Sequence, residues 1–111
     1  MKIPNAEGAV VDIRKLRDYC LNLAHDEGKH KARLFASKLN MTADDAEDLR
    51  DILLAAINTQ EDARLGRRDE YGQQFLLVSV IEWHGKQAMI RSGWIIEHGL
   101  EIPRLTTCYP L

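Results

Sequence analysis

Apolar residues recur every three or four positions through the first half of the chain, the spacing that places side chains on one face of a helix. Asp12 is suited to cap a first helix that begins at Ile13. A second helix is expected from Lys29 to Leu39, and Thr42 is suited to cap a third helix with a clear apolar stripe. The pattern predicts that residues 1–62 are mainly helical.

The second half changes to runs of branched and aromatic residues separated by glycine turns, which is typical of strands. Strands are expected over residues 74–83, 86–97 and 103–109, and hairpin-linked strands pair antiparallel. Residues 73–110 therefore predict an antiparallel β-meander, with 9–11 as a candidate edge strand and 63–72 as a linker. The 111 residues are predicted to form a single α+β domain, in which three helices pack on a three- to four-stranded antiparallel sheet.

The first long strand is apolar on both of its alternating faces. One set consists of Phe75, Leu77, Ile81 and Trp83, and the other of Leu76, Val78 and Val80. One set can face the helices, whereas the other must be covered by loops, by the N-terminal segment or by a partner, which includes a second copy in a homodimer. In the last strand, regular alternation puts Arg104 and Thr106 on one face and Leu105, Thr107 and Tyr109 on the other.

Charge is unevenly distributed along the chain. The net charge of −2 argues weakly against a nucleic-acid binder, but residues 14–38 carry seven Lys/Arg against three acids, and residues 42–62 carry seven acids against one base. A local positive patch can hold a phosphate backbone even in a slightly acidic protein. The alternative is that two helix faces of opposite sign attract one another.

Several classes of protein are disfavoured by what the sequence lacks. No segment approaches the roughly 20 apolar residues of a membrane span, and the first residues contain no apolar signal region. The sequence therefore predicts a cytoplasmic protein with no membrane partner, export without a cleavable signal being the alternative. Cys20 and Cys108 have no metal-ligand spacing and are expected to be free thiols. No phosphate loop or metal motif occurs, so no metal and no cofactor are expected.

Two histidines and three cations are concentrated between His25 and Arg33, at the predicted start of a helix. Cations at that end oppose the helix dipole, and this unfavourable placement suggests an anion site. The alternative is that Lys29 and Arg33, four residues apart, form a solvated stripe. Arg91 lies inside an apolar strand, where it must find a ligand phosphate or a carboxylate of the fold.

Six blocks in one order resemble a bacterial domain family of unknown function, found both alone and at the C-termini of polymorphic toxins. The blocks are Lys2–Ala6, Lys15–Asn22, Gly28–Phe35, Asp69–Gln73, Arg91–Ile95 and Pro103–Tyr109. That family is in turn similar to the ribonuclease toxins that include barnase, EndoU, colicin-type tRNases and RelE. The resemblance implies an N-terminal group of helices against a four-stranded antiparallel sheet.

The resemblance also implies roles for individual residues. Lys31 would contact phosphate or transfer a proton, His25 would be the base or acid, and Arg91 would stabilise the phosphorane. Thr107 and Tyr109 would complete the pocket. Three further cations are expected to bind RNA phosphates: Lys29, Arg33 and Arg104.

The leading hypothesis is a metal-independent endoribonuclease toxin that attacks RNA through its 2′-hydroxyl and is countered by a small cognate antitoxin or immunity protein. One alternative is a non-catalytic interaction module of such a system, and another is an enzyme of a different class on the same scaffold. For catalysis, His25, Lys31, Arg91 and Thr107 are expected to line one cleft.

Overall fold

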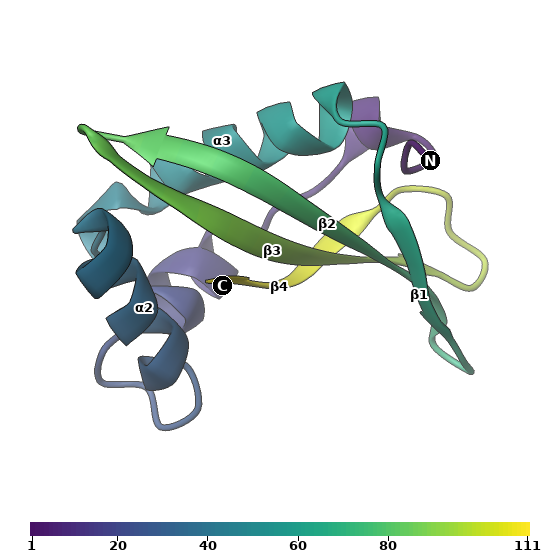
Figure 1. Ribbon diagram of the computed structural model, residues 1–111. Helices are drawn as coiled ribbons and strands as arrows, with labels where there is room; N and C mark the ends of the chain where they lie inside the picture. Colours follow the sequence, from purple (N-terminus) through teal and green to yellow (C-terminus); the bar gives the residue numbers. More distant parts are fainter.

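Helices precede strands in the structure, a computed structural model that describes residues 1–111 (Figure 1). The helical elements are η1 (Ala6–Gly8), α1 (Ile13–Lys15), the π-helical turn η2 (Leu16–Cys20), α2 (Lys29–Leu39), η3 (Ala43–Asp45) and α3 (Ala46–Thr59). The strands are β1 (Arg64–Arg68), β2 (Gly72–Trp83), β3 (Lys86–Glu97) and β4 (Arg104–Pro110). All neighbours pair antiparallel in the order β1-β2-β3-β4, which confirms the predicted α+β fold.

The fourth strand is β1, which lies inside the segment predicted as a linker. Four of its five residues are exposed and three are arginines, so it carries no apolar alternation by which a strand could be recognised. The segment 9–11 contributes only an isolated parallel bridge between Val10 and Arg104. The expectation of an edge strand there is wrong.

Local sequence explains where the helices begin and end. Helix α2 has the predicted bounds and ends at Asn40, which adopts the left-handed conformation at φ 53°. Thr42 begins the next helical segment, where its backbone N–H donates to the Asp45 carboxylate at 2.9 Å. The first helix is shorter than expected, because α1 passes into the π-helical turn, in which Leu21 N–H bonds to the Leu16 carbonyl at 2.8 Å.

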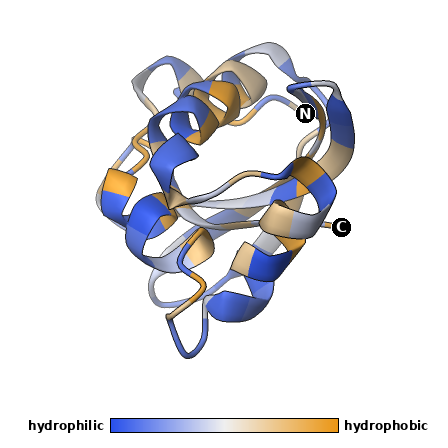
Figure 2. Ribbon diagram, turned by 90° about the vertical axis from the view of Figure 1, so that its left-hand side faces the viewer, coloured by the Kyte–Doolittle hydropathy of each residue, from blue (hydrophilic) through white to orange (hydrophobic).

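The core lies between the helices and one face of the sheet, and α3 runs behind β2 in Figure 1. Hydrophobic and hydrophilic residues alternate around the helical turns in Figure 2, as amphipathic helices require. From β2, Phe75, Leu77 and Ile81 are buried in this core. The other apolar set remains uncovered, since Leu76 is 38% and Val80 64% exposed. No helix is long and apolar enough to cross a membrane.

A bulge in β4 changes which of its side chains lie outside. Leu105 pairs with Trp94 and Thr107 pairs with Gly93, so Thr106 is an extra residue without a partner on β3. Leu105 consequently lies in the core, while Thr107 and Tyr109 lie on the outer face. The regular alternation expected for this strand is wrong at Thr106.

Cys20 and Cys108 are free thiols, as expected, and both are completely buried. The fold brings them together, because a hydrogen bond joins the two side chains. This hydrogen bond and burial raise the pKa of Cys108, which therefore stays protonated at neutral pH. The pair fixes η2 against β4 from inside the core.

Two neighbouring residues of β2 test the assignment of the sheet faces. Ile81→Ala should lower the free energy of unfolding by about 2–4 kcal/mol, because it leaves a cavity in the core. Val80→Ala should cost less than about 1 kcal/mol, because Val80 is already largely in water. Urea titration followed by circular dichroism measures both, and equal costs would contradict the assignment.

Candidate functional site

Lys31 lies between two tyrosines at the edge of β4. It projects from the first turn of α2, and its Nζ donates a hydrogen bond to the Tyr19 hydroxyl of η2 at 2.7 Å. The same Nζ lies 4.8 Å from the centroid of the Tyr19 ring and 6.0 Å from that of Tyr109 on β4. Aromatic faces attract a cation at such distances, so three elements hold this ammonium group in place.

The surroundings of Lys31 determine its charge. Partial burial disfavours the ammonium form, but the hydrogen bond to Tyr19 and the interactions with Tyr19, Cys20 and Tyr109 outweigh it, so the pKa of Lys31 is raised. Lys31 is therefore a cation at neutral pH. It can stabilise an anion or donate a proton, and it is not a general base there.

Arg91 and Tyr109 extend the cluster onto the outer face of the sheet. They are directly paired across β3 and β4, and Arg91 Nη1 donates to the Tyr109 hydroxyl at 3.4 Å. No carboxylate pairs with Arg91, so its guanidinium remains available to an external anion. Because the Tyr109 oxygen accepts from Arg91, its own proton is free for another acceptor.

His25 has a different position from the one expected of a general base. Its Nδ1 accepts the backbone N–H groups of Glu27 and Gly28 at 3.1 and 2.9 Å, and its ring meets the Tyr19 ring edge-on at 4.9 Å. The ring therefore fixes the loop that precedes α2 and packs against Tyr19. With Nδ1 occupied as an acceptor, the neutral ring carries its proton on Nε2, which is a donor.

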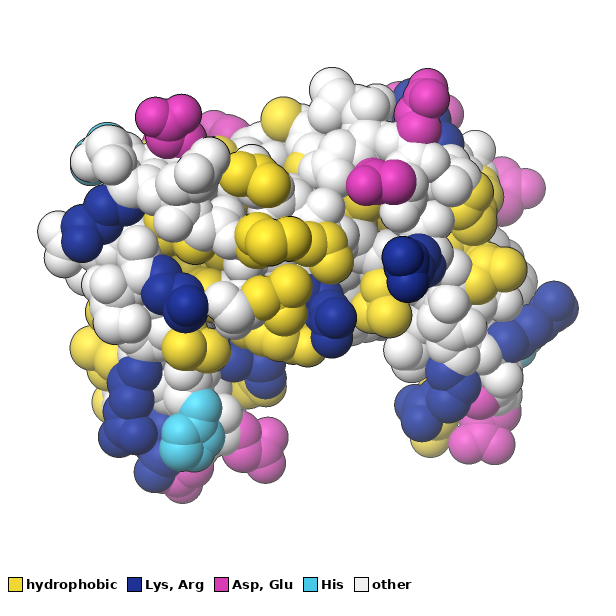
Figure 3. Space-filling model, in the orientation of Figure 1, with side chains coloured by type: hydrophobic (Ala, Val, Ile, Leu, Met, Phe, Trp, Pro, Cys, Tyr) yellow, Lys and Arg dark blue, Asp and Glu magenta, His cyan; other side chains and the backbone are white.

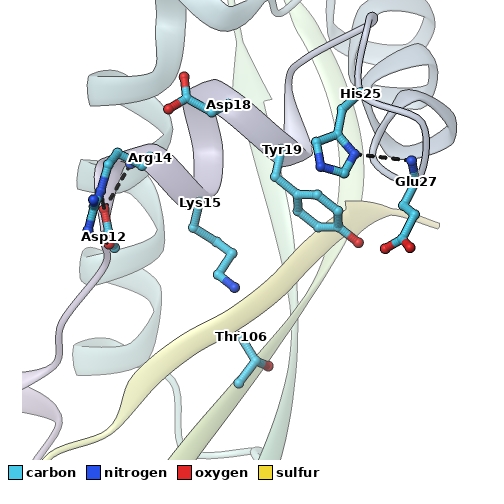
Figure 4. Close-up of a pocket in the computed structure, with 8 residues that line it drawn as sticks. All are labelled: Asp12, Arg14, Lys15, Asp18, Tyr19, His25, Glu27 and Thr106. Carbon is cyan, nitrogen blue, oxygen red and sulfur yellow. Dashed lines mark hydrogen bonds and ion pairs between the residues drawn. The ribbon is translucent and has the colours of Figure 1, made fainter.

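Two of the expected site residues, His25 and Arg91, line separate hollows. The helix-side cleft, of about 660 Å³, lies between η2, the loop before α2 and β4 (Figure 4). Its lining residues are Asp12, Arg14, Lys15, Asp18, Tyr19, His25, Glu27 and Thr106. The outer-face groove, of about 420 Å³, is lined by Asp62, Arg64, Leu76, Val78, Met89, Arg91 and Leu111.

His25, Lys31, Arg91 and Thr107 thus do not share one cleft. His25 lines the helix-side cleft and Arg91 lines the outer-face groove. The contact of Lys31 with Tyr109, which bonds to Arg91, connects the two sides. Thr107 lies beside Gly93, and its hydroxyl is buried without a hydrogen-bond partner, so it does not face a ligand in this arrangement.

The family model of a domain of unknown function (DUF6883) matches residues 2–111. The chain belongs to this family. A chain of a contact-dependent growth inhibition toxin–immunity protein complex from Klebsiella pneumoniae 342 is similar in structure, with a TM-score of 0.71 and 15% identity, over 92% of this chain and 99% of that chain. At this identity the likeness shows a shared fold. No curated protein matches in sequence.

The other cations of this DUF6883 domain differ in their availability. Arg104 forms an ion pair with Glu97 and is thereby engaged within the fold. Lys29 and Arg33 form no ion pair, and Arg33 is exposed on α2. The ion pairs of the domain are local along the chain, and none joins the basic segment 14–38 to the acidic segment 42–62. The interpretation of two attracting helix faces therefore has no ion pair to support it.

Tyr19 belongs to the site, but the sequence did not predict it as a site residue. It lay inside one of the blocks of the family resemblance, but no spacing rule pointed it toward Lys31. It reaches Lys31 from a π-helical turn, whose i+5 bonding changes the direction of side chains relative to an α-helix. No three or more His, Cys, Asp or Glu side chains of the domain are grouped so that they could hold a metal ion.

Tyr19→Phe tests the electrostatics of the cluster. Loss of the hydroxyl removes the hydrogen bond that favours the ammonium form and leaves the opposing effect of burial. The pKa of Lys31 should therefore fall relative to wild type. Titration of the Lys31 Cε and Hε signals by two-dimensional NMR measures it, with Lys38 on the same helix as internal control. An unchanged or higher pKa of Lys31 would contradict the account.

Gly28→Ala tests the contact that sets α2 against η2. A Cβ at position 28 would lie 2.2 Å from the Tyr19 carbonyl oxygen, and this backbone atom cannot swing aside. The DUF6883 domain should lose about 1–3 kcal/mol of unfolding free energy, as overpacked sites do. Gly66→Ala is the control, because its nearest neighbour, the Gln74 Cβ, is 3.2 Å away. An equal loss in both variants, measured by urea titration, would refute the steric explanation.

Proposed function

We propose that this domain is a metal-independent endoribonuclease toxin acting in the cytoplasm. The observation that carries the proposal is the convergence of the Lys31 ammonium, the Tyr109 phenol and the Arg91 guanidinium at β4. Two cations and a phenol are groups that phosphodiester cleavage through the 2′-hydroxyl can use. The similar fold of a chain from a toxin–immunity protein complex supports a role in a system of that kind.

In the proposed reaction the 2′-hydroxyl of RNA gives its proton to solvent water, its oxygen bonds to phosphorus, and the bond from phosphorus to the 5′-oxygen breaks. The products are a 2′,3′-cyclic phosphate and a free 5′-hydroxyl. Negative charge grows on the pentacoordinate phosphate, where Lys31 and Arg91 stabilise it. Tyr109 has its proton free to protonate the departing 5′-oxygen, since its own oxygen accepts from Arg91.

The remaining predicted residues have supporting roles in this proposal. His25 positions Lys31 indirectly, because it fixes the loop before α2 and packs on Tyr19, the hydrogen-bond partner of Lys31. Lys29 and Arg33 have no carboxylate partners and attract the phosphate backbone to this side of α2. Thr107 supports the outer face next to Gly93.

A nuclease of this kind must be inhibited in the cell that makes it, so we propose a small cognate immunity protein or antitoxin as its partner. The structurally similar chain comes from a toxin–immunity protein complex. The cationic cluster around Lys31 offers such a partner an anchor for acidic side chains. A carboxylate seated between Lys31 and Arg91 would occupy the place of the substrate phosphate and thereby inhibit.

A second candidate function is a non-catalytic interaction module of the same kind of system. The exposed apolar side chains Leu76, Val80 and Met89 favour it, since such a patch on an otherwise covered sheet is suited to a protein partner. In that case the same fold would bind without cutting RNA.

Induced expression in bacterial cells separates the two functions. The toxin should arrest growth and produce RNA fragments with 2′,3′-cyclic phosphate and 5′-hydroxyl ends. With purified protein, Lys31→Ala and Tyr109→Phe should each lower the cleavage rate by about 10²–10³-fold, the cost of removing one transition-state contact.

Lys38→Ala is the matched control, because this exposed lysine belongs to the same helix but lies outside the cluster. It should cleave at the wild-type rate. Intact RNA and unimpaired growth with the wild-type protein would overturn the ribonuclease proposal and leave the interaction module.

A further inference from the structure

The outer-face groove has an apolar floor and charged walls. Its floor consists of Leu76 and Val78 from β2 and Met89 from β3, while Arg64 and Arg91 stand on its two sides. Figure 3 shows hydrophobic side chains gathered across the centre of this face, with Lys and Arg side chains between them and acidic ones mostly toward the margins. The groove is of the size that binds small ligands.

The walls of the groove are aligned in one row across the sheet. Val78 pairs with Arg91, and Arg91 pairs with Tyr109. On the other side of Val78 lies Asp62, because Gln60 Nε2 donates both to the Val78 carbonyl at 2.9 Å and to Asp62 Oδ1 at 3.2 Å. Asp62 and Arg91 therefore line the same groove on opposite sides of Val78.

Asp62 is an exposed carboxylate that one hydrogen-bonded side chain, Gln60, connects to the core. The buried Ser79 hydroxyl donates to Gln60 Oε1 at 2.5 Å, which fixes the amide whose nitrogen holds Asp62. No cation pairs with Asp62, although Arg64 and Arg91 line the same groove. The second oxygen of the Asp62 carboxylate therefore has no hydrogen-bond partner and can accept from a ligand. It does so in a groove whose two walls carry Arg64 and Arg91.

These charges orient a polynucleotide in the groove. A phosphate is attracted to Arg91, next to Tyr109, whereas on the opposite wall the charge of Asp62 offsets the attraction of Arg64. The edge of a nucleobase carries N–H donors, which suit the Asp62 carboxylate on the opposite wall. The face of the same base can then pack on Leu76 and Val78. Only an unpaired base has that edge and that face free.

We propose that the outer-face groove binds one unpaired nucleobase beside the cleaved phosphate, and that Asp62 accepts hydrogen bonds from its Watson–Crick edge. Guanine fits best, because its N1–H and N2–H groups offer two adjacent donors to one carboxylate. Uracil and thymine fit worst, because a single N–H lies between two carbonyl oxygens that Asp62 repels. This inference rests on the proposed ribonuclease function, which makes RNA the ligand. It adds that the bound RNA is single-stranded and that the groove prefers guanine.

Binding of uncleavable DNA heptamers tests the inference separately from catalysis. The probes are dT₃-dX-dT₃ with X = G, A, C or T, all lacking the 2′-hydroxyl, titrated into the wild-type protein and followed by fluorescence anisotropy. The G heptamer should bind about tenfold more tightly than the T heptamer, the discrimination expected of one good bidentate contact. Asp62→Asn should reduce this preference to less than twofold.

Two further variants and one control complete the design. Ser79→Ala, which frees Gln60, should weaken the preference for G, and Arg64→Gln should lower the affinity of all four heptamers alike. Asp51→Asn, the same change at an exposed position of α3, should alter nothing. Thermal melting shows that each variant is folded.

The outcomes separate this inference from the proposed function. Equal binding of all four heptamers, no binding, or a preference for G that survives in Asp62→Asn would overturn the base site even if the protein cleaves RNA. Selective binding of the G heptamer without cleavage of RNA would support the base site and overturn the nuclease.

Discussion

The helices cover one face of the four-stranded sheet, and the alternation of side chains along each strand then determines what the other face displays. In β2, Phe75, Leu77 and Ile81 must point into the core, so Leu76, Val78 and Val80 must point away from it. A shift of register by one residue would exchange the two sets and expose the core residues, which makes the register strongly specified. The open face and its groove are thus consequences of how the core is packed.

The same constraint explains why the bulge at Thr106 matters. Leu105 is needed in the core opposite Trp94, and uninterrupted alternation would then direct Thr107 and Tyr109 into the core as well. The extra residue returns Cys108 to the core and brings Tyr109 out beside Arg91. Tyr109 at the edge strand can then approach both Arg91 on the sheet and Lys31 on α2, so one irregularity joins two parts of the site.

Sequence patterns predicted the elements that bury one continuous face and missed those that do not. Helix α2 was predicted with its bounds because Ala32, Phe35 and Leu39 mark a single stripe. Strand β1 was missed because it lies at the sheet edge, where most of Arg64–Arg68 is exposed. Its sequence therefore lacks the alternation of apolar and polar residues that marks a strand.

The site was predicted less well, for two physical reasons. The family resemblance pointed to Lys31 and Arg91, but it could not show that Tyr19 would contact Lys31, because a π-helical turn follows no common spacing. The role of His25 depends on which ring nitrogen is occupied, and Nδ1 is committed to the backbone of Glu27 and Gly28. These hydrogen bonds depend on the conformation of the loop, which the residue types alone do not determine.

The net charge of −2 is a poor guide to this domain because charge acts locally. Ionic screening limits interactions between exposed charges to about 8–10 Å in physiological salt. Several acids of the segment 42–62 are on α3, which lies behind the sheet, so a phosphate near Lys31 or Arg91 is largely shielded from them. Asp62 belongs to the same acidic segment but lines the groove. In the proposed base site, a phosphate bound at Arg91 would lie within reach of the Asp62 charge, which would then favour one direction of the nucleotide in the groove.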